Sequence, residues 1–294
     1  MQLADTAIVA APARVADFVE LTKPRITFLV LVTTAVGYAL GVGPSFHPAV
    51  FLSLLVGTAF VSGGASALNQ WAERDTDARM ARTCSRPLPA GRLVPTDALA
   101  FGLAISAVGI ALLAGAVNGL TALLASVSLG GYVLAYTPLK RVTSLCTLVG
   151  AVPGAIPPMM GWAAARGTLD REAWALFAVL FLWQLPHFLS IAWIYRDDYA
   201  RAGFPMLPVT DPDGRSTARQ TVAYAAALIP VTLLAGAFAA AGQGYLWSAV
   251  GLGAVFVGCA IVFAVKRSVR AARIVFLVSV FYLPAVLGLM VFDR

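Results

Sequence analysis

Nine long apolar runs dominate the 294-residue chain and leave little room for a soluble fold. Crossing the hydrocarbon core of a bilayer takes roughly 20 consecutive apolar residues in a helix. With 60% hydrophobic and 12% charged residues, the chain cannot cover such runs with polar surface. The sequence therefore predicts an all-α, polytopic membrane protein with nine transmembrane helices, at 26–43, 48–70, 97–117, 119–138, 143–164, 173–195, 217–240, 244–265 and 271–291.

We expect a single domain, 1–294, in which 1–22 form a cytoplasmic lead-in. The first 25 residues carry Asp5, Asp17 and Glu20 and open with no basic cluster. That composition is unlike a cleavable signal peptide, which needs a positive start and a clear apolar core. The lead-in is therefore expected to be soluble.

Basic residues fall on alternate connections between the runs. With the N-terminus placed inside, 18 of the 21 Lys and Arg residues lie on the inner side, and only Arg166, Arg171 and Arg294 lie outside. Because Lys and Arg in short loops set the orientation of a membrane protein, this pattern predicts an inner (cytoplasmic) membrane protein with its N-terminus cytoplasmic and its C-terminus outside. The same rule accounts for the net charge of +7 without a nucleic-acid partner.

Acidic residues gather on the predicted inner side as well, and orientation does not require that. Of 14 Asp and Glu residues, 11 lie there, chiefly in the loops after the second and sixth runs. Acids contribute little to membrane orientation, so paired acidic and basic clusters need another cause. A bound polyanion together with a divalent metal would supply it.

The first acidic cluster has the spacing of a metal-diphosphate site. Asn69, Glu73 and Asp77 are four residues apart, so they share one face if the second helix continues past the bilayer. Oxygen ligands of this kind suit Mg²⁺, which fills its remaining positions with water and substrate phosphate oxygens. Arg82 and Arg86 follow, and guanidinium groups match phosphate geometry. A solvated loop with ion pairs along the helix is the alternative that spacing alone leaves open.

Two further polar clusters lie on the same side. Lys140 and Arg141 end the fourth run, where they could hold a diphosphate or simply anchor the topology. After the sixth run, Asp197 and Asp198 stand between arginines. Two similar clusters four helices apart suggest a pseudo-symmetric pair of metal sites that face each other.

The membrane interior also has unusual features. The segment GAVPGAIPPMMGW places three prolines in the fifth run and predicts a broken helix whose freed backbone groups face protein or a cavity. In the sixth run, Gln184 and His187 share one face, and His187 falls near the bilayer middle. An ionisable residue at that depth is a functional candidate, although a hydrogen bond between helices would explain it equally well.

Together these segments resemble the successive signatures of the haem O synthases, protoheme IX farnesyltransferases within the UbiA-type intramembrane prenyltransferase family. The resemblance spans roughly 20–290 and rests on N-x3-E-x3-D, MARTCSRPLPAGR, YTPLKR, GAVPGAIPPMMGW, WQLPHF and RDDYARAGFPMLPV. It implies a nine-helix bundle around a central cavity, with Mg²⁺ as cofactor. It also implies transfer of a farnesyl group from farnesyl diphosphate to a vinyl group of haem B, which gives haem O for terminal oxidases.

The resemblance assigns roles to individual residues. The expected catalytic residues are Asn69, Glu73, Asp77 and Asp198, and the first three are the expected metal ligands. The expected substrate-binding residues are Arg82, Arg86, Lys140, Arg141, Tyr199, Gln184 and His187. His187 is the candidate for contacting haem, with an axial role open. Tyrosines at 195 and 199, where relatives that act on aromatic acids show a fuller D-x3-D, argue against a second metal held by two carboxylates.

Two other functions fit parts of the pattern. One is a UbiA-type prenyltransferase with a quinone-precursor or chlorophyll-like acceptor. The other is a secondary transporter, which broken helices and a midplane histidine suit, although the acids lie at one membrane face rather than along a path. The expected partners are farnesyl diphosphate and haem B as substrates, the lipid bilayer, and a haem A synthase or terminal oxidase assembly proteins, with no nucleic acid.

Overall fold

The computed structural model describes residues 14–43 and 46–293. Most of the predicted lead-in, 1–13, and the predicted outer base Arg294 lie outside the described residues. The rest of the lead-in contains a short helix, α1 (Val15–Leu21).

Nine helical spans in the described residues are long and apolar enough to cross a membrane, as the sequence predicts. They are α2 (Pro24–Gly41), α3 (Pro48–Asp77), α4 (Pro95–Ala116), α5 to α6 (Gly119–Leu139), α7 with α8 (Cys146–Arg166), α9 (Arg171–Ile194), α12 (Arg215–Phe238), α13 (Gln243–Lys266) and α14 (Val269–Phe292). Most ends agree with the predicted runs to within three residues. The main difference is α3, which continues beyond residue 70 to Asp77.

The fifth span is kinked at its prolines. Helix α7 (Cys146–Ala155) ends one residue before α8 (Pro157–Arg166), and Ile156 between them keeps helical angles of φ −71 and ψ −33. Pro157 has no N–H, so the carbonyl of Pro153 loses its usual helical donor. The Ser128 hydroxyl donates to that carbonyl at 3.0 Å. The Ile156 N–H also reaches that carbonyl at 3.4 Å, so the freed group is satisfied within the protein, as a membrane interior requires.

The fourth span contains a π-helical segment that the sequence pattern does not reveal. Helix α5 (Gly119–Gly130) passes into η1 (Gly131–Tyr136) and then α6 (Thr137–Leu139). Short π segments inside α-helices occur frequently at functional sites. Here the segment is separated from Lys140 and Arg141 only by the single turn of α6.

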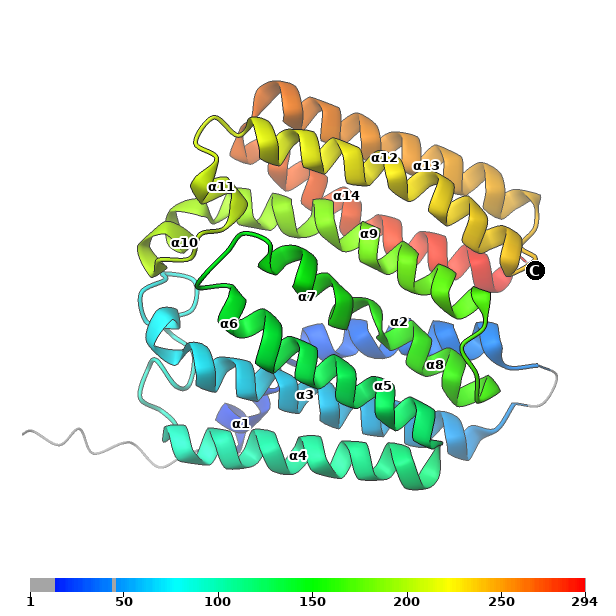
Figure 1. The fold of residues 1–294 in the computed structure, drawn as a ribbon, viewed down its shortest axis with the longest axis horizontal. Helices are drawn as coiled ribbons and strands as arrows, with labels where there is room; N and C mark the ends of the chain where they lie inside the picture. The colour runs from blue at the N-terminus through cyan, green and yellow to red at the C-terminus, as the bar shows by residue number, and fades with distance from the viewer. Residues whose placement is uncertain (1–13, 44–45, 294) are drawn as a thin grey trace, which may run out of the picture.

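The helices pack as two groups, and less extensive contacts join one group to the other (Figure 1). Helices α9, α12, α13 and α14 share one apolar core that includes Tyr245, Phe256 and Tyr282. Helices α2, α3, α4, α5 and α8 share a second core around Tyr38 and Met160. Contacts of α7 and α8 with α9, and of α2 with α14, join the groups.

Glycines let α2 and α8 approach closely. A Cβ added at Gly37 would lie 2.0 Å from the Pro158 carbonyl oxygen, and one at Gly161 would lie 2.0 Å from the Thr34 carbonyl oxygen. Lipid chains are as apolar as side chains, so helices in a bilayer associate through such close packing rather than through hydrophobic burial.

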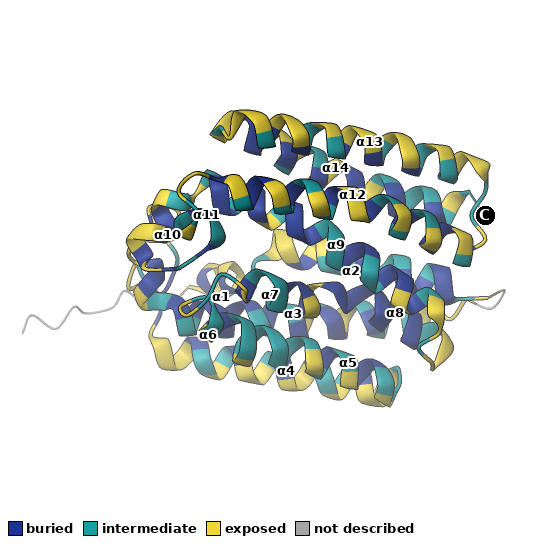
Figure 2. Ribbon diagram, turned by 45° about the horizontal axis from the view of Figure 1, so that its top comes forward, coloured by how far each residue is buried: buried dark blue, intermediate teal, exposed yellow. Residues whose placement is uncertain are grey.

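The outward faces of the bundle are apolar, which marks an integral membrane protein. Exposed residues follow the outer sides of α4 and α13 (Figure 2). Leu103 is 55% exposed, Val255 56% and Phe281 74%. Continuous apolar surface of this extent would not be stable in water but is suited to lipid.

The polar connections collect at one end of the bundle. The end of α3, residues 78–94, α10 (Arg196–Ala202) and α11 (Leu207–Thr210) lie there, opposite the C-terminal end of α14 (Figure 1). Met80, Tyr199 and Phe204 form a small buried cluster beneath these loops. Arg92 ties α1 to the same end through Asp17 and Glu20.

Candidate active site

The last two turns of α3 carry a buried polar face. Because α3 continues to Asp77, Asn69, Glu73 and Asp77 lie on one side of a single helix, as their spacing predicts. Their exposed fractions are only 2%, 2% and 0%. Burial of two carboxylates is costly unless cations or hydrogen-bond donors face them. The solvated loop that spacing alone left open does not describe these residues.

A cation from elsewhere in the chain faces each of the three side chains. Lys140 Nζ donates to both Glu73 oxygens at 2.8 and 3.0 Å. Arg86 Nη1 donates to Asp77 Oδ2 at 2.6 Å. Lys23 Nζ donates to Asn69 Oδ1 at 3.3 Å. The structure thus brings Arg86 and Lys140, both predicted site residues, onto the predicted metal-binding face.

Lys140 is held as a cation by its surroundings. Burial is the largest single influence and lowers the pKa of Lys140. The charge of Glu73, its hydrogen bond and the nearby Tyr199 and Tyr132 act together to raise that pKa above its ordinary value. Lys140 also lies over the Tyr136 ring at 5.2 Å. A lysine held charged beside a buried carboxylate is prepared to meet an anion.

Lys23 is a site residue that the sequence did not reveal. It precedes Pro24 in a left-handed conformation, φ 47, which turns its side chain toward Asn69 on α3. Burial, and then repulsion from Arg86, lower the pKa of Lys23 to about 7. Its side chain nevertheless keeps some accessible surface.

The π segment supplies two further residues that the sequence did not single out. The Tyr132 and Tyr136 rings stack at 5.3 Å. Gly150 makes room for Tyr136, since an added Cβ would lie 2.5 Å from its ring. Thr137, the next residue, accepts a hydrogen bond from Asn69 Nδ2 at 3.1 Å. The π turn therefore places an aromatic pair next to the polar face of α3.

Among the described residues, Asp197 and Asp198 make no hydrogen bond or ion pair with Asn69, Glu73 or Asp77. Asp198 pairs with Arg201 on its own helix, and Asp197 is exposed. Tyr199 accepts a hydrogen bond from Arg82 Nη2 at 3.2 Å, and the Arg82 guanidinium lies 4.9 Å from the Tyr195 ring. The tyrosines that replace acids in this motif thus hold an arginine.

The oxygen atoms of the described site residues could supply part of the coordination of one metal ion, with substrate oxygens supplying the rest. No three His, Cys, Asp or Glu side chains within 14–43 and 46–293 lie close enough to hold a metal by themselves. Asp77 Oδ1, however, is buried with no hydrogen-bond partner among these residues. A buried carboxylate oxygen without a partner is costly, and a bound cation is one group that would satisfy it. Two carboxylates with substrate phosphate oxygens are a usual environment for Mg²⁺.

In the part of the chain that the structure describes, three predicted substrate-binding residues make no hydrogen bond to the side chains of Asn69, Glu73 or Asp77. Arg141 donates to the Ala72 carbonyl at 2.8 Å. Gln184 is buried and donates to the carbonyls of Ala151 and Leu180, so it braces α7 against α9. His187 contacts α14 within the membrane span. Substrate contacts for these three residues stay predictions.

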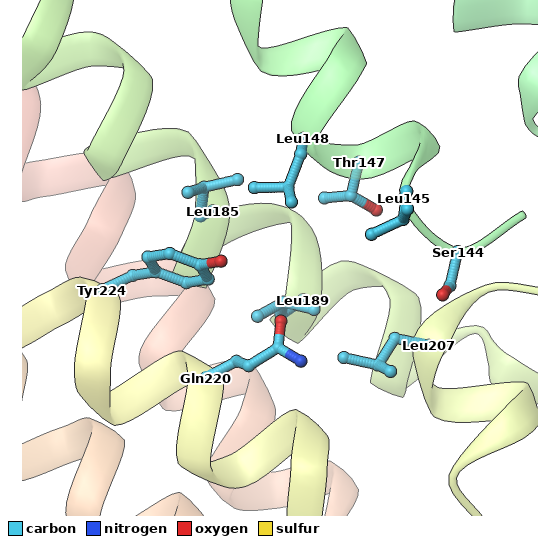
Figure 3. A pocket seen from close by; sticks show the side chains of 9 residues that line it. All are labelled: Ser144, Leu145, Thr147, Leu148, Leu185, Leu189, Leu207, Gln220 and Tyr224. Carbon is cyan, nitrogen blue, oxygen red and sulfur yellow. The ribbon is translucent and has the colours of Figure 1, made fainter.

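Two pockets recorded in the described residues lie elsewhere. One opens between α7, α9, α11 and α12 (Figure 3), with a volume of about 50 Å³. That volume is small beside the several hundred Å³ of ordinary ligand sites. The other, of about 380 Å³, lies between α2, α3 and α4 and opens outward. Neither is lined by a predicted site residue.

Comparison with known proteins places this geometry in context. A sequence model of the UbiA prenyltransferase family matches residues 30–284. A protein named protoheme IX farnesyltransferase from Solibacter usitatus is 50% identical over 287 residues, 95% of this chain and 98% of that protein. A second of that name, from Koribacter versatilis, is 45% identical over 95% of this chain and 93% of that protein.

Solved structures share the fold. A digeranylgeranylglyceryl phosphate synthase superposes with a TM-score of 0.80 at 15% identity, covering 95% of this chain and 97% of that chain. A UbiA homologue from Archaeoglobus fulgidus, bound to GPP and Mg²⁺, gives a TM-score of 0.63 at 15% identity, covering 93% and 99%. At these identities the likeness shows the fold alone.

Proposed function

This chain belongs to the UbiA prenyltransferase family, and on that premise we propose that it transfers a farnesyl group from farnesyl diphosphate to a vinyl group of haem B, forming haem O for terminal oxidases. The observation that carries the proposal is near-full-length identity of 42–50% to several protoheme IX farnesyltransferases. The buried cation and carboxylate face of α3 supports a diphosphate as one substrate.

Asn69, Glu73 and Asp77 are the residues that would hold Mg²⁺. Support comes from their shared helical face and from the unpartnered Asp77 Oδ1. When bound, the metal would neutralise charge on the diphosphate as a Lewis acid. A homologous fold with GPP and Mg²⁺ bound is consistent with such a site.

The cations of the chain stabilise the leaving diphosphate. Arg86, Lys140 and Lys23 each donate to one of the three metal-binding side chains, so a diphosphate seated there comes within reach of all three. Negative charge grows on the diphosphate as the allylic C1–O bond breaks. Fixed cations shielded from water stabilise that charge more strongly than water does.

The aromatic pair beneath Lys140 suits the other half of the reaction. Tyr132 and Tyr136 present stacked rings beside the polar face, and ring faces attract an allylic cation. The lipid-embedded bundle keeps bulk water from that cation, so it reaches the electron-rich vinyl group of haem instead. Water then captures the carbon cation next to the porphyrin and loses a proton, which leaves the hydroxyl group of the product.

The proposed orientation places this end of the bundle in the cytoplasm. The loops around the site carry most of the basic residues, and loops rich in Lys and Arg stay on the cytoplasmic side. The same end is where a water-soluble diphosphate head group would be delivered and released.

Product identification tests the proposed function. The full chain in lipid nanodiscs is supplied with haem B, farnesyl diphosphate and Mg²⁺, and products are analysed by mass spectrometry. We expect a haem that has gained one farnesyl group and one hydroxyl group. A parallel sample receives 4-hydroxybenzoate and a long polyprenyl diphosphate. Prenylated 4-hydroxybenzoate together with unchanged haem B would overturn the proposal.

A further inference from the structure

His187 on α9 faces Ser279 on α14 within the membrane span. Its Nδ1 lies 2.7 Å from Ser279 Oγ, a hydrogen bond between residues 92 positions apart. The chain has two histidines, and the other, His47, is exposed in the connection before α3. His187 is therefore the only imidazole that the sequence places inside the bundle.

The two hydrogen bonds of the Ser279 hydroxyl indicate which nitrogen of the His187 ring carries the hydrogen. Ser279 Oγ also lies 2.6 Å from the Phe276 carbonyl oxygen, which can only accept. A serine hydroxyl has one hydrogen, and Ser279 uses it for that carbonyl. Ser279 must then accept from His187, so Nδ1 bears the hydrogen and Nε2 carries the lone pair.

Neighbouring rings hold the imidazole in place. The Trp183 ring is nearly parallel to it at 5.0 Å and 24°, and the Phe276 ring lies at 5.1 Å and 33°. Trp183 Nε1 is itself tied to the Ser279 carbonyl at 2.8 Å. Phe188 meets the imidazole edge to face at 5.6 Å. His187 Nε2 makes no hydrogen bond to any residue within 14–43 and 46–293.

We propose that His187 Nε2 is the axial ligand of the iron of the haem substrate and that Ser279 is the residue that positions it, an inference that rests on the proposed function. Histidines that ligate metals almost always donate their other N–H to a fixed acceptor, which sets the tautomer and the ring orientation. A neutral imidazole ligand is the usual proximal ligand of haem iron. The surrounding aromatic side chains are suited to a porphyrin face.

The position of His187 agrees with its proposed role. It lies seven residues before the end of α9 at Ile194, or roughly 10 Å below that end by helical rise. Iron held there places the porphyrin inside the bundle and below the diphosphate end.

Comparing haem B with iron-free protoporphyrin IX tests the proposal, because the two share their vinyl groups and differ in the metal. The full chain in nanodiscs is titrated with each. We expect His187→Ala to weaken haem B binding by at least the roughly 10–100-fold that loss of an outer-shell partner usually costs and to leave protoporphyrin IX binding unchanged. Unchanged protoporphyrin binding also shows that the variant is folded. His47→Ala, the matched histidine control, should leave both affinities unchanged.

Ser279→Ala tests whether Ser279 positions the ligand, through a spectroscopic band that would not change if Ser279 only joined the two helices. In the wild type we expect an iron–histidine stretching band in the resonance Raman spectrum of ferrous haem. Loss of the Nδ1–H acceptor should shift that band, whereas added imidazole should restore nitrogen ligation in His187→Gly. Equal haem B binding by wild type and His187→Ala, or no nitrogen ligation in the wild-type spectrum, would overturn the inference. Wild-type farnesyl transfer is scored separately, so the proposed function can stand if this ligand fails.

Discussion

At the scale of single residues, the buried carboxylates of α3 should be the most sensitive positions. Glu73→Gln and Asp77→Asn keep the size of each side chain and remove the charge that would hold the metal. We expect farnesyl transfer to fall at least about 100-fold, the usual cost of losing one electrostatic contact to a transition state. Initial rates at saturating Mg²⁺ measure this, and protoporphyrin IX binding reports that the bundle is intact.

Asp75 provides a matched control on the same helix. It lies between Glu73 and Asp77 in sequence, but its side chain is 72% exposed. Asp75→Asn should therefore change the rate by no more than about twofold, as surface substitutions usually do. Full activity in Glu73→Gln or Asp77→Asn would contradict the assignment of these residues as metal ligands.

Lys23 should act on binding of the diphosphate substrate. Lys23→Gln removes the amine that donates to Asn69 and leaves an uncharged polar side chain that is one atom shorter. Losing one charge-assisted hydrogen bond costs about 1.5–3 kcal/mol, so we expect the KM for farnesyl diphosphate to rise about tenfold or more. Steady-state kinetics with varied farnesyl diphosphate measure it. Arg25→Gln, exposed two residues away, should leave KM unchanged; equal effects of both variants would refute a specific role for Lys23.

Sequence spacing predicted the arrangement of those candidate site residues that lie on one helix. Asn69, Glu73 and Asp77 lie on one helix, so their spacing alone predicts a common face. Lys23 was missed because its contact with Asn69 joins residues 46 apart and depends on how α2 packs on α3. Tyr136 was missed because its place next to Lys140 depends on a π turn.

At the scale of helices, close packing of α2 on α8 should limit stability. Gly161→Ala would bring a Cβ to 2.0 Å from the Thr34 carbonyl oxygen, which is backbone and cannot rotate away. The helices must then separate, and overpacking of this kind costs about 1–3 kcal/mol. Thermal unfolding in a fixed detergent should show a lower midpoint for this variant.

Gly251 on α13 is the matched glycine control. It is exposed, and a Cβ added there would meet no atom within 4 Å. Gly251→Ala should leave the unfolding midpoint unchanged or raise it slightly, because alanine favours a helix by about 1 kcal/mol over glycine. The same loss of stability in both variants would show that the α2–α8 approach is not the cause.

The helical spans were predictable because each is a single apolar run of bilayer length. The π segment was not, since the residues of Gly131–Tyr136 show no pattern that separates a π turn from an α turn. Three prolines correctly indicated a break in the fifth span. Only packing shows that the break is a kink, with the Ser128 hydroxyl satisfying the Pro153 carbonyl.

At the scale of the whole molecule, the distribution of basic residues predicts which side of the membrane the candidate site faces. The nine spans among the described residues are an odd number, so they put the two ends of the helical part on opposite sides, and we expect the basic loops to keep the site end on the cytoplasmic side. Cys84 is a natural reporter for that end, because it is exposed in the loop after α3. Cys146 is buried and Cys259 lies within α13, so a water-soluble thiol reagent reaches them poorly.

We expect a membrane-impermeant maleimide to label Cys84 in inside-out vesicles and not in right-side-out vesicles. A second protein, with Cys84→Ser and Gln243→Cys, should show the opposite pattern, because Gln243 is exposed at the start of α13, at the other end of the bundle. Cys84→Ser alone should show no labelling from either side. Labelling of Cys84 from outside would reverse the proposed orientation and would place diphosphate delivery on the side of the membrane that the positive loops are expected to avoid.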